Sequence, residues 1–272
     1  MIVRSRVSKA PAALIFPLSV LHRRYAVECE IGHGGCAHVF RAWDAQAAQV
    51  VAIKRAHLSQ KSEELLLSEA ELLAGLHHPA IPAFLEYFEE DGRCYLVEEW
   101  RAGTPMKRMR FFSLPKVLWI GRTLGDVLAY VHSRDLFHGD LAPGNVLLAE
   151  QALSLIDFGF ARCSSDPPRT KGTPGYASPE QWQEGMGSAA GDIFSLGMLL
   201  GCALTDTTPE EVQRARSFSN LWDEPGDVPA ELVPLLALLD HMIAATPDAR
   251  PALAEVQQFL HAMERQLIST QG

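Results

Sequence analysis

The sequence has few cysteines, and none of them stands in a paired motif. Five cysteines are scattered over 272 residues, with no Cys-x-x-Cys pair and no other spacing typical of zinc ligands. An odd number of isolated thiols suits a reducing compartment better than an oxidising one. We therefore expect a cytoplasmic protein without a structural zinc site.

The sequence also lacks internal repeats, low-complexity segments and any apolar run long enough to span a bilayer. Near the N-terminus, Arg4, Arg6 and Lys9 precede a short apolar run, as in a secretory signal. Prolines interrupt that run, and no small-x-small cleavage site follows it. We expect residues 1–24 to form a basic extension that packs on the domain, with contact to a membrane surface or targeting as the alternative.

Positive charge is in deficit. The chain has 24 Lys and Arg against 33 Asp and Glu, a net charge of −9. Because an acidic protein repels phosphate, we expect no non-specific binding to nucleic acid. Acidity favours a basic partner or substrate but is mainly a solubility feature. The remaining composition, with 47% hydrophobic residues, is that of a globular chain with one large domain or two lobes.

Hydrophobic periodicity divides the chain into a sheet-rich part and a helical part. In the first part the predicted elements are strands at 25–31, 39–40, 50–53, 84–88 and 95–97, with one helix at 59–76. In the second part they are helices near 114–133, 180–186, 190–204, 229–245 and 251–268, with short strands at 146–148 and 153–156. The junction of two such parts is a natural place for a ligand cleft.

A glycine-rich run, IGHGGCAHV at 31–39, lies at a turn between two predicted strands. Glycines at such a turn let backbone N–H groups approach phosphate oxygens without a Cβ in the way. No Gly-Lys-Ser/Thr follows, so the run is not a Walker loop. A hairpin with a flexible tip is the alternative interpretation of this run alone.

Lys54 ends the apolar strand VAIK. A lysine in that position is costly unless an anion meets it. The helix that follows offers Glu69 as a carboxylate partner. We expect this pair to hold the ammonium group ready for the α and β phosphates of a nucleotide.

Three oxygen-donor side chains lie on loops beside the two short strands of the second part. Asp140 and Asn145 belong to the run FHGDLAPGNVLL, and Asp157 belongs to LIDFG. Magnesium prefers oxygen ligands and takes few of them from protein when phosphates are present. One Asn and one Asp therefore suffice for the metal, and Asp140 is free to orient a hydroxyl nucleophile.

Taken in order, these motifs resemble the eukaryotic-type protein kinase family, and most closely its bacterial Ser/Thr branch. The resemblance runs from about Tyr25 to Gln266, nearly the whole chain. Three further segments carry it: GTPGYASPE at 172–180, GDIFSLG at 191–197 and PDARP at 247–251. The first is similar to the family's substrate-binding segment, and the second to the helix whose Asp braces the catalytic loop. The third contains the Arg that pairs, in the family, with the position of Glu180.

The resemblance implies an α+β fold with the bilobal arrangement of protein kinases over residues 25–268. The small β-rich N-lobe, with one main helix, is expected at about 25–98. The larger, mostly helical C-lobe is expected at about 102–268. ATP and magnesium are the implied cofactors, and an unknown protein is the implied substrate.

The resemblance also implies a role for each matching residue. The glycines of the 31–39 run, with Ala37 in place of the third one, are implied to cover the phosphates. Three apolar residues are implied to enclose adenine. The backbone groups of two further residues are implied to bind the edge of the base. The implied nucleotide-binding residues are Gly32, Gly34, Gly35, Ala37, Val39, Ala52, Lys54, Glu99, Arg101 and Leu147. Asn145 and Asp157 are the implied magnesium ligands. Asp140 is the implied catalytic base, supported by Lys54, Glu69 and Thr173.

Three positions depart from the family pattern. Gly139 replaces the Arg of His-Arg-Asp, and Ala142 replaces the Lys that contacts the γ phosphate. Losing that cation costs about 10²-fold in rate by analogy with other transition-state donors, unless Arg169 or Lys171 substitutes for it. Glu98 stands where the family has an apolar residue behind adenine. We expect this carboxyl to be paired or partly protonated, and inhibitors that need an apolar back pocket to bind poorly.

Without the arginine at position 139, a phosphate on the activation segment lacks the anchor that it usually has in the family. We therefore predict that phosphorylation of Ser164, Ser165, Thr170 or Thr173 does not switch the protein on. Alanine and phosphomimetic substitutions at these positions, compared in a rate assay, test the prediction. A strong change in rate through ordering of the segment would contradict it.

Three functions remain open at this point. The first is transfer of the ATP γ-phosphoryl group to Ser or Thr of a protein, which Thr173 and the 172–180 segment favour. The second is a pseudokinase, a nucleotide-binding or scaffolding module, which Gly139 and Ala142 keep open. The third is a small-molecule kinase, since His-Gly-Asp followed by Asn also resembles aminoglycoside and choline kinases. Those enzymes lack the 172–180 segment.

Overall fold

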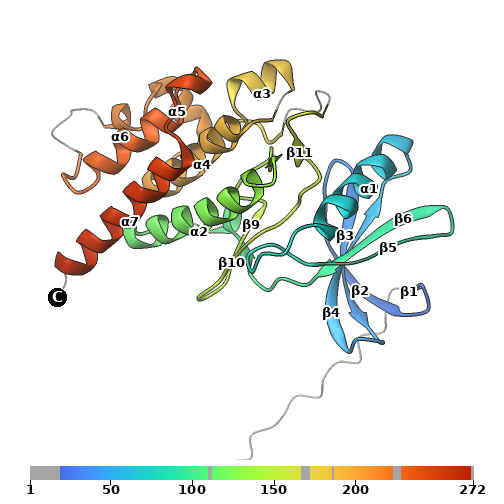
Figure 1. The fold of residues 1–272 in the computed structure, drawn as a ribbon. Helices are drawn as coiled ribbons and strands as arrows, with labels where there is room; N and C mark the ends of the chain where they lie inside the picture. The colour runs from blue at the N-terminus through green and yellow to red at the C-terminus, as the bar shows by residue number, and fades with distance from the viewer. Residues whose placement is uncertain (1–18, 110–111, 167–171, 186, 223–227, 271–272) are drawn as a thin grey trace, which may run out of the picture.

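The computed structural model describes residues 19–109, 112–166, 172–185, 187–222 and 228–270. A sheet with one long helix forms one lobe, and a cluster of helices forms the other (Figure 1). This is the α+β architecture that the sequence predicted.

The N-lobe is a six-stranded antiparallel sheet covered by one helix. Its strands, in sheet order, are β1 (Ser19–Leu21), β2 (Tyr25–His33), β3 (Ala37–Asp44), β4 (Gln49–Ala56), β6 (Arg93–Glu99) and β5 (Phe84–Glu90). Helix α1 (Gln60–Ala74) packs on β6 and β5. It begins after Ser59, whose hydroxyl accepts a hydrogen bond from the Ser62 amide and so caps the helix.

The sheet begins earlier than the strand pattern indicated. Strand β1, which pairs with β2, lies within residues 1–24, the segment expected to be an extension. Arg24, in the turn of this hairpin, forms ion pairs with Asp44 at 2.7 Å and with Glu86 at 3.0 Å. The basic residues of 1–18 lie outside the described residues.

The C-lobe is built from helices, and its strands are short. Its helices are α2 (Leu114–His132), α3 (Pro179–Glu184), α4 (Ala189–Thr205), α5 (Pro209–Ala215), α6 (Val233–Met242) and α7 (Leu253–Thr270). Its strands are β7 (Thr104–Pro105), β8 (Leu136–Phe137), β9 (Val146–Leu148), β10 (Leu153–Leu155) and β11 (Arg162–Cys163). Single 3₁₀ turns span Met106–Arg108, Ser219–Leu221 and Pro247–Ala249.

Each helix predicted from periodicity is present, but α5 was not predicted. Its start carries a capping box, in which Thr208 and Glu211 satisfy each other's backbone amides. That Thr-x-x-Glu pattern is visible in the sequence and was the available signal.

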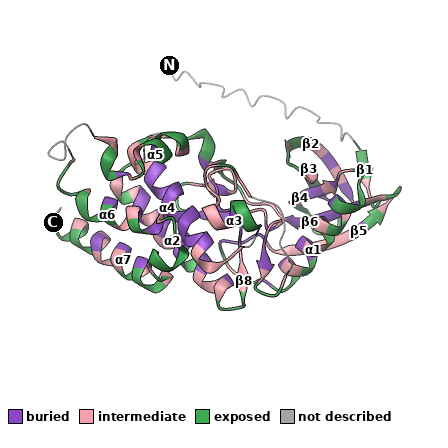
Figure 2. Cartoon of the chain, turned by 90° about the horizontal axis from the view of Figure 1, so that it is seen from above, coloured by how far each residue is buried: buried purple, intermediate pink, exposed green. Residues whose placement is uncertain are grey.

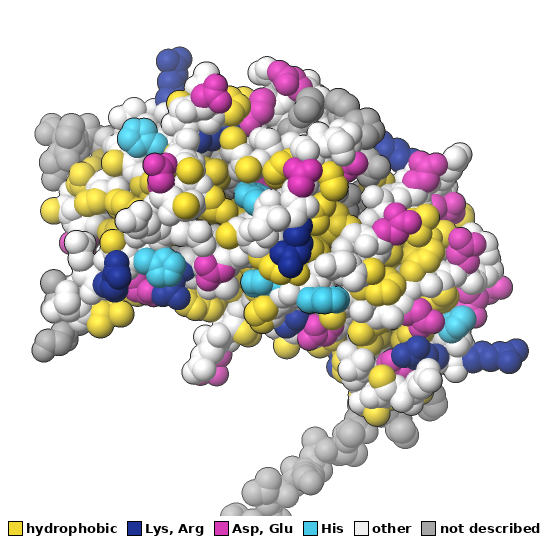
Figure 3. Space-filling view, in the orientation of Figure 1, with side chains coloured by type: hydrophobic (Ala, Val, Ile, Leu, Met, Phe, Trp, Pro, Cys, Tyr) yellow, Lys and Arg dark blue, Asp and Glu magenta, His cyan; other side chains and the backbone are white. Residues whose placement is uncertain are grey.

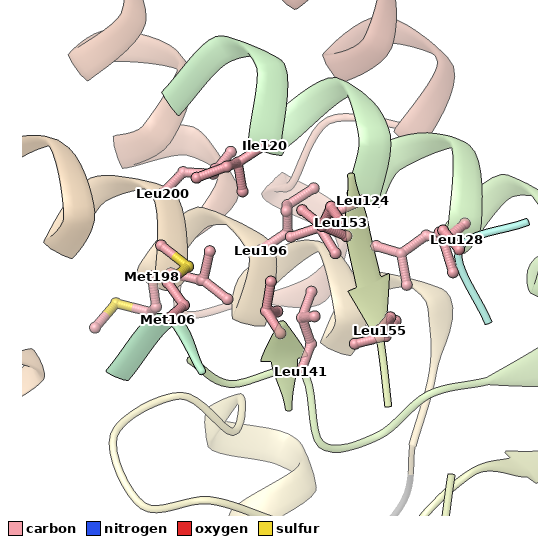
Figure 4. Packing of buried hydrophobic residues seen from close by; sticks show 14 of the residues in the cluster. Met106, Ile120, Leu124, Leu128, Leu141, Leu153, Leu155, Leu196, Met198 and Leu200 are labelled. Atoms are coloured by element: carbon pink, nitrogen blue, oxygen red, sulfur yellow. The ribbon is translucent and has the colours of Figure 1, made fainter. Parts of the chain in front are cut away.

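The C-lobe core joins α2 and α4. Figure 4 shows leucine and isoleucine side chains of α2 meeting those of α4, with β10 and the chain near Leu141 closing the cluster. Residues 191–202 of α4 are all buried, as the colouring in Figure 2 shows. Acidic and basic side chains are interspersed on the face shown in Figure 3, so no large patch of one charge covers it.

No single helix among the described residues is long and apolar enough to cross a membrane. One pair of helices, α4 with α5, passes the length and composition test only when taken together, across a bend of 97°.

Arg250 ties the end of the C-lobe to α3. Its guanidinium donates to Glu180 Oε1 at 2.6 Å and Oε2 at 2.8 Å, and to the Ala190 and Ala244 carbonyls at 2.9 Å each. We expect Arg250→Met to lower the free energy of unfolding by about 3 kcal/mol, because Glu180 and two carbonyls lose their partner. Urea denaturation measures this.

The matched control is Arg265→Met, a substitution at an exposed position of α7. It is expected to leave the free energy of unfolding unchanged. Equal stability of the Arg250→Met variant and the natural protein would contradict the prediction.

Candidate active site

A cavity of about 500 Å³ lies between the two lobes. It is lined from the N-lobe by the β2–β3 turn, β4, α1 and β6, and from the C-lobe by the segments around β7, β9 and Asp157. The residues predicted to bind nucleotide or metal all line it: Gly32, Gly34, Gly35, Ala37, Val39, Ala52, Lys54, Glu69, Glu99, Arg101, Asn145, Leu147 and Asp157. Asp140 and Thr173 are not part of the lining and lie beside it.

The glycine-rich turn is closed by a hydrogen bond from the Gly34 amide to the Ala37 carbonyl at 2.9 Å. A Cβ added at Gly32 or Gly35 would meet no described atom within 4 Å. Packing within the chain therefore does not require glycine at these two positions. The space that a side chain would occupy is left to a ligand, as a phosphate-binding backbone needs.

Lys54 connects three elements at the back of the cavity. Its Nζ lies 2.5 Å from Glu69 Oε1 on α1 and 3.6 Å from Asp157 Oδ1. The same Glu69 oxygen accepts a hydrogen bond from the Phe158 amide at 2.9 Å. Lys54 and Glu69 are both 5% exposed, so this pair fixes α1 and the 157–159 loop against the sheet.

One cation thus faces several carboxylates. Burial alone would lower the pKa of Lys54, but attraction by Glu69, Glu98 and Asp157 outweighs it and raises that pKa well above its usual range. Burial raises the pKa of Glu69 to about 7, whereas Lys54 lowers the pKa of Asp157. The excess of negative charge suits a site that receives a divalent cation.

Asp140 is held by two segments of the chain. Its Oδ1 accepts hydrogen bonds from the Thr173 amide and from Thr173 Oγ1, each at 2.6 Å. Its Oδ2 accepts one from Asn145 Nδ2 at 3.0 Å. Burial raises the pKa of Asp140, and the hydrogen bond from Thr173 opposes this. A carboxylate positioned in this way beside a cavity suits acceptance of a proton from a hydroxyl group.

The loop that carries Asp140 is braced from α4. The Asp192 carboxylate accepts hydrogen bonds from the amides of His138 and Gly139, both at 2.9 Å. It also lies 2.8 Å from His132 Nε2 on α2. Since Asp192 is 1% exposed, these hydrogen bonds are shielded from water.

Comparison with known proteins agrees with this geometry. A family model described as the protein kinase domain matches residues 25–261. The chain belongs to the protein kinase family.

Several relatives are Ser/Thr kinases. The chain is 29% identical to the DNA damage-responsive serine/threonine-protein kinase RqkA of Deinococcus radiodurans, over 92% of this chain and 41% of that protein. It is 30% identical to the cell cycle serine/threonine-protein kinase CDC5/MSD2 of Saccharomyces cerevisiae, over 85% of this chain and 35% of that protein. It is 31% identical to the serine/threonine-protein kinase PknG of Mycolicibacterium smegmatis, over 70% of this chain and 26% of that protein. The chain thus spans less than half the length of these relatives.

In this kinase domain, Gly139 links the loop that carries Asp140 to helix α3. Its backbone has φ of +72°, and a Cβ there would lie 2.9 Å from the Phe160 carbonyl oxygen. Its own carbonyl accepts a hydrogen bond from Gln181 Nε2 of α3. Gln181 is buried, and no sequence pattern singled it out. The two segments are therefore joined without a phosphate group.

Ala142, the second position that departs from the family pattern, is buried, with 2% of its surface exposed. Arg169 and Lys171, the two cations considered as substitutes for the missing lysine, lie outside the described residues, as does Thr170. The cavity lining instead includes Lys107 and Arg108. Sequence patterns did not single out these two residues.

Glu98 lies at the back of the kinase cavity, opposite Ala52 of β4. Its side chain is 5% exposed, and its Oε2 lies 3.8 Å from Lys54 Nζ. That oxygen accepts no hydrogen bond from any residue that the structure describes. Burial raises the pKa of Glu98, and attraction by Lys54 only partly offsets this. The basic partner expected for this carboxyl is thus Lys54, which it shares with Glu69.

We expect Glu98→Met to raise the free energy of unfolding by about 1–3 kcal/mol, because it removes a buried carboxyl with an unsatisfied oxygen. Urea denaturation without nucleotide measures this. Inhibitors that need an apolar back pocket should also bind the variant more tightly. Glu89→Met, at an exposed position of β5, is the matched control and should change neither quantity. A destabilised Glu98→Met variant would contradict the prediction.

Proposed function

We propose that this kinase domain, extending over residues 25–268, transfers the γ-phosphoryl group of ATP to a Ser or Thr hydroxyl of a protein. The observation that carries the proposal is the placement of Asp140. Its carboxylate is bound to Thr173 of the substrate segment and to Asn145 of the cavity lining. One side chain thus connects the place of the acceptor with the place of the nucleotide.

The residues present fit a nucleotide with magnesium. Asn145 and Asp157 supply oxygen donors on neighbouring loops, and Lys54 supplies a cation for phosphate oxygens. Among the described residues there is no group of three or more His, Cys, Asp or Glu that would hold a metal by itself. Magnesium at this site would therefore take its other ligands from phosphates and water, as it usually does.

We assign the adenine site to the inner end of the cavity. Val39 and Ala52 of the N-lobe and Leu147 of the C-lobe line it, and they would enclose the base between apolar surfaces. Backbone groups of Glu99 and Arg101 would bind the base edge. The glycine turn with Ala37 would cover the phosphates.

In the proposed mechanism, Asp140 orients the acceptor hydroxyl and accepts its proton during transfer. Asn145 and Thr173 hold the Asp140 carboxylate in place. Lys54 orients the phosphates, and Glu69 keeps the Lys54 ammonium in position. Bound magnesium would neutralise the charge that develops on the phosphates.

A transfer assay tests the proposal. The purified chain is incubated with radiolabelled Mg-ATP and a generic protein substrate, followed by phosphoamino-acid analysis, with Asp157→Ala as the control variant. We expect phosphoserine or phosphothreonine from the natural protein and none from the control. Magnesium-dependent nucleotide binding without transfer would support a pseudokinase instead. Label on an aminoglycoside or choline, but not on protein, would support a small-molecule kinase.

A further inference from the structure

Two exposed cations lie at the rim of the active-site cavity. Lys107 and Arg108 belong to the 3₁₀ turn between β7 and α2, and both line the cavity. The first residue of the turn, Met106, is buried in the C-lobe core near Met198, as Figure 4 shows. The turn is thus anchored in the core, and its two charged residues face outward.

The turn is also fixed against the catalytic loop. The Lys107 amide donates a hydrogen bond to the Pro143 carbonyl at 3.0 Å. The Lys107 side chain lies over Gly144, with Nζ 3.6 Å from the point where a Cβ of that glycine would stand. Gly144 directly precedes Asn145. A side chain at position 144 would therefore occupy the space beside the Lys107 chain.

The charge of these two residues is not neutralised within the described part of the chain. Neither Lys107 nor Arg108 forms an ion pair with a described residue, whereas the other cations of the cavity lining are paired. Lys54 pairs with Glu69, and Arg101 lies 2.8 Å from Glu99. Two free positive charges therefore stand at the rim of a cavity whose interior is rich in carboxylates.

The position of Lys107 and Arg108 indicates which part of a protein substrate would contact them. An acceptor hydroxyl that reaches Asp140 brings the flanking residues of its own chain across the catalytic loop and the adjoining turn. An extended chain advances about 3.3 Å per residue, so side chains a few positions from the acceptor fall over neighbouring surface of this kind. A carboxylate there would gain two partners, and a lysine would meet two like charges.

We propose that Lys107 and Arg108 form a subsite for an acidic residue of the protein substrate, within a few positions of the acceptor hydroxyl. The inference rests on the proposed kinase function. It differs from what the net charge of −9 favours, a basic substrate, because two local charges at the site outweigh a distant, screened surplus.

Matched peptides test the subsite. Each carries one serine, flanked two and three positions away on both sides by Glu, by Gln or by Lys. For the natural protein we expect kcat/KM to be about tenfold higher for the Glu peptide than for the Gln peptide, since two exposed ion pairs each contribute modestly. Lys107→Ala combined with Arg108→Ala should abolish the difference, and Lys107→Glu combined with Arg108→Glu should favour the Lys peptide. Arg265→Ala, at an exposed position on α7, should retain the natural preference.

Two outcomes would overturn the inference. One is an equal loss of rate for all three peptides in the Lys107→Ala variant, which would place this lysine on the nucleotide phosphates. The other is a natural protein that prefers the Lys peptide.

If no peptide is phosphorylated, the kinase proposal fails, and binding still tests the subsite. Fluorescence polarisation with a labelled Glu peptide, in the presence of a non-hydrolysable ATP analogue and magnesium, should show tighter binding than with the Gln peptide. Lys107→Ala should remove that difference. Equal binding of both peptides by the natural protein would contradict the subsite.

Discussion

The Asp140→Asn variant is expected to have a turnover number lower by about 10²- to 10⁴-fold, with unchanged affinity for nucleotide. Asparagine has nearly the same shape as aspartate and keeps an oxygen that accepts the Thr173 hydrogen bonds. It does not accept the proton of the acceptor hydroxyl. Asp140 is not part of the cavity lining, and Asn145 of that lining keeps its hydrogen bond to the Asp140 backbone carbonyl at 2.8 Å, so nucleotide affinity should not change.

Single-turnover kinetics and calorimetric titration with a non-hydrolysable analogue measure the two quantities separately. Asp91→Asn is the matched control, since Asp91 lies in the β5–β6 turn, is not part of the cavity lining and has a positive φ of 51° that asparagine tolerates. A turnover number within a factor of about three of the natural value would remove Asp140 from the role of base.

Replacing Asp157 by asparagine is expected to weaken nucleotide binding in the presence of magnesium by about 100-fold. The carboxylate lies in the cavity lining, 3.6 Å from Lys54, and its negative charge is what a divalent cation would use. Without magnesium, the effect of the substitution on nucleotide affinity should have the opposite sign. The natural carboxylate then repels the phosphates, so the variant should bind nucleotide as tightly as the natural protein or more tightly.

Titration calorimetry measures the nucleotide affinity of the natural protein and of the variant, first with magnesium and then with a chelator. Melting temperatures without ligand show whether the variant is folded. If magnesium strengthened nucleotide binding equally in the two proteins, Asp157 would not be a ligand of the metal. Asn145 would then be the first residue to examine.

Much of the candidate site was predictable from the sequence because its residues lie in short, ordered motifs. The Gly32–Val39 turn, Lys54 and the Asp140–Asn145 loop each combine a strand end with the residue type that phosphate or magnesium requires. Local chemistry of this kind is readable along the chain. The order of the motifs then indicated the family, and the family implied which of them meet.

Other features depend on contacts between residues far apart in sequence. The Gln181–Gly139 hydrogen bond joins positions 42 residues apart. Lys107 lies beside Gly144 because a buried methionine and one backbone hydrogen bond hold the 3₁₀ turn there. No periodicity or local propensity encodes such neighbours.

The sequence alone predicted a sheet-rich part and a helical part, because strand and helix periods are local properties. The resemblance of its motifs to a family then implied the two-lobed fold and the residues that we propose for the phosphate and magnesium sites. Three features became visible only in the folded chain: β1 extends the sheet, Glu98 shares Lys54 with Glu69, and two cations at the cavity rim form no ion pair with a described residue. These features follow from how burial and charge are distributed once the lobes pack, and that distribution is a property of the whole fold.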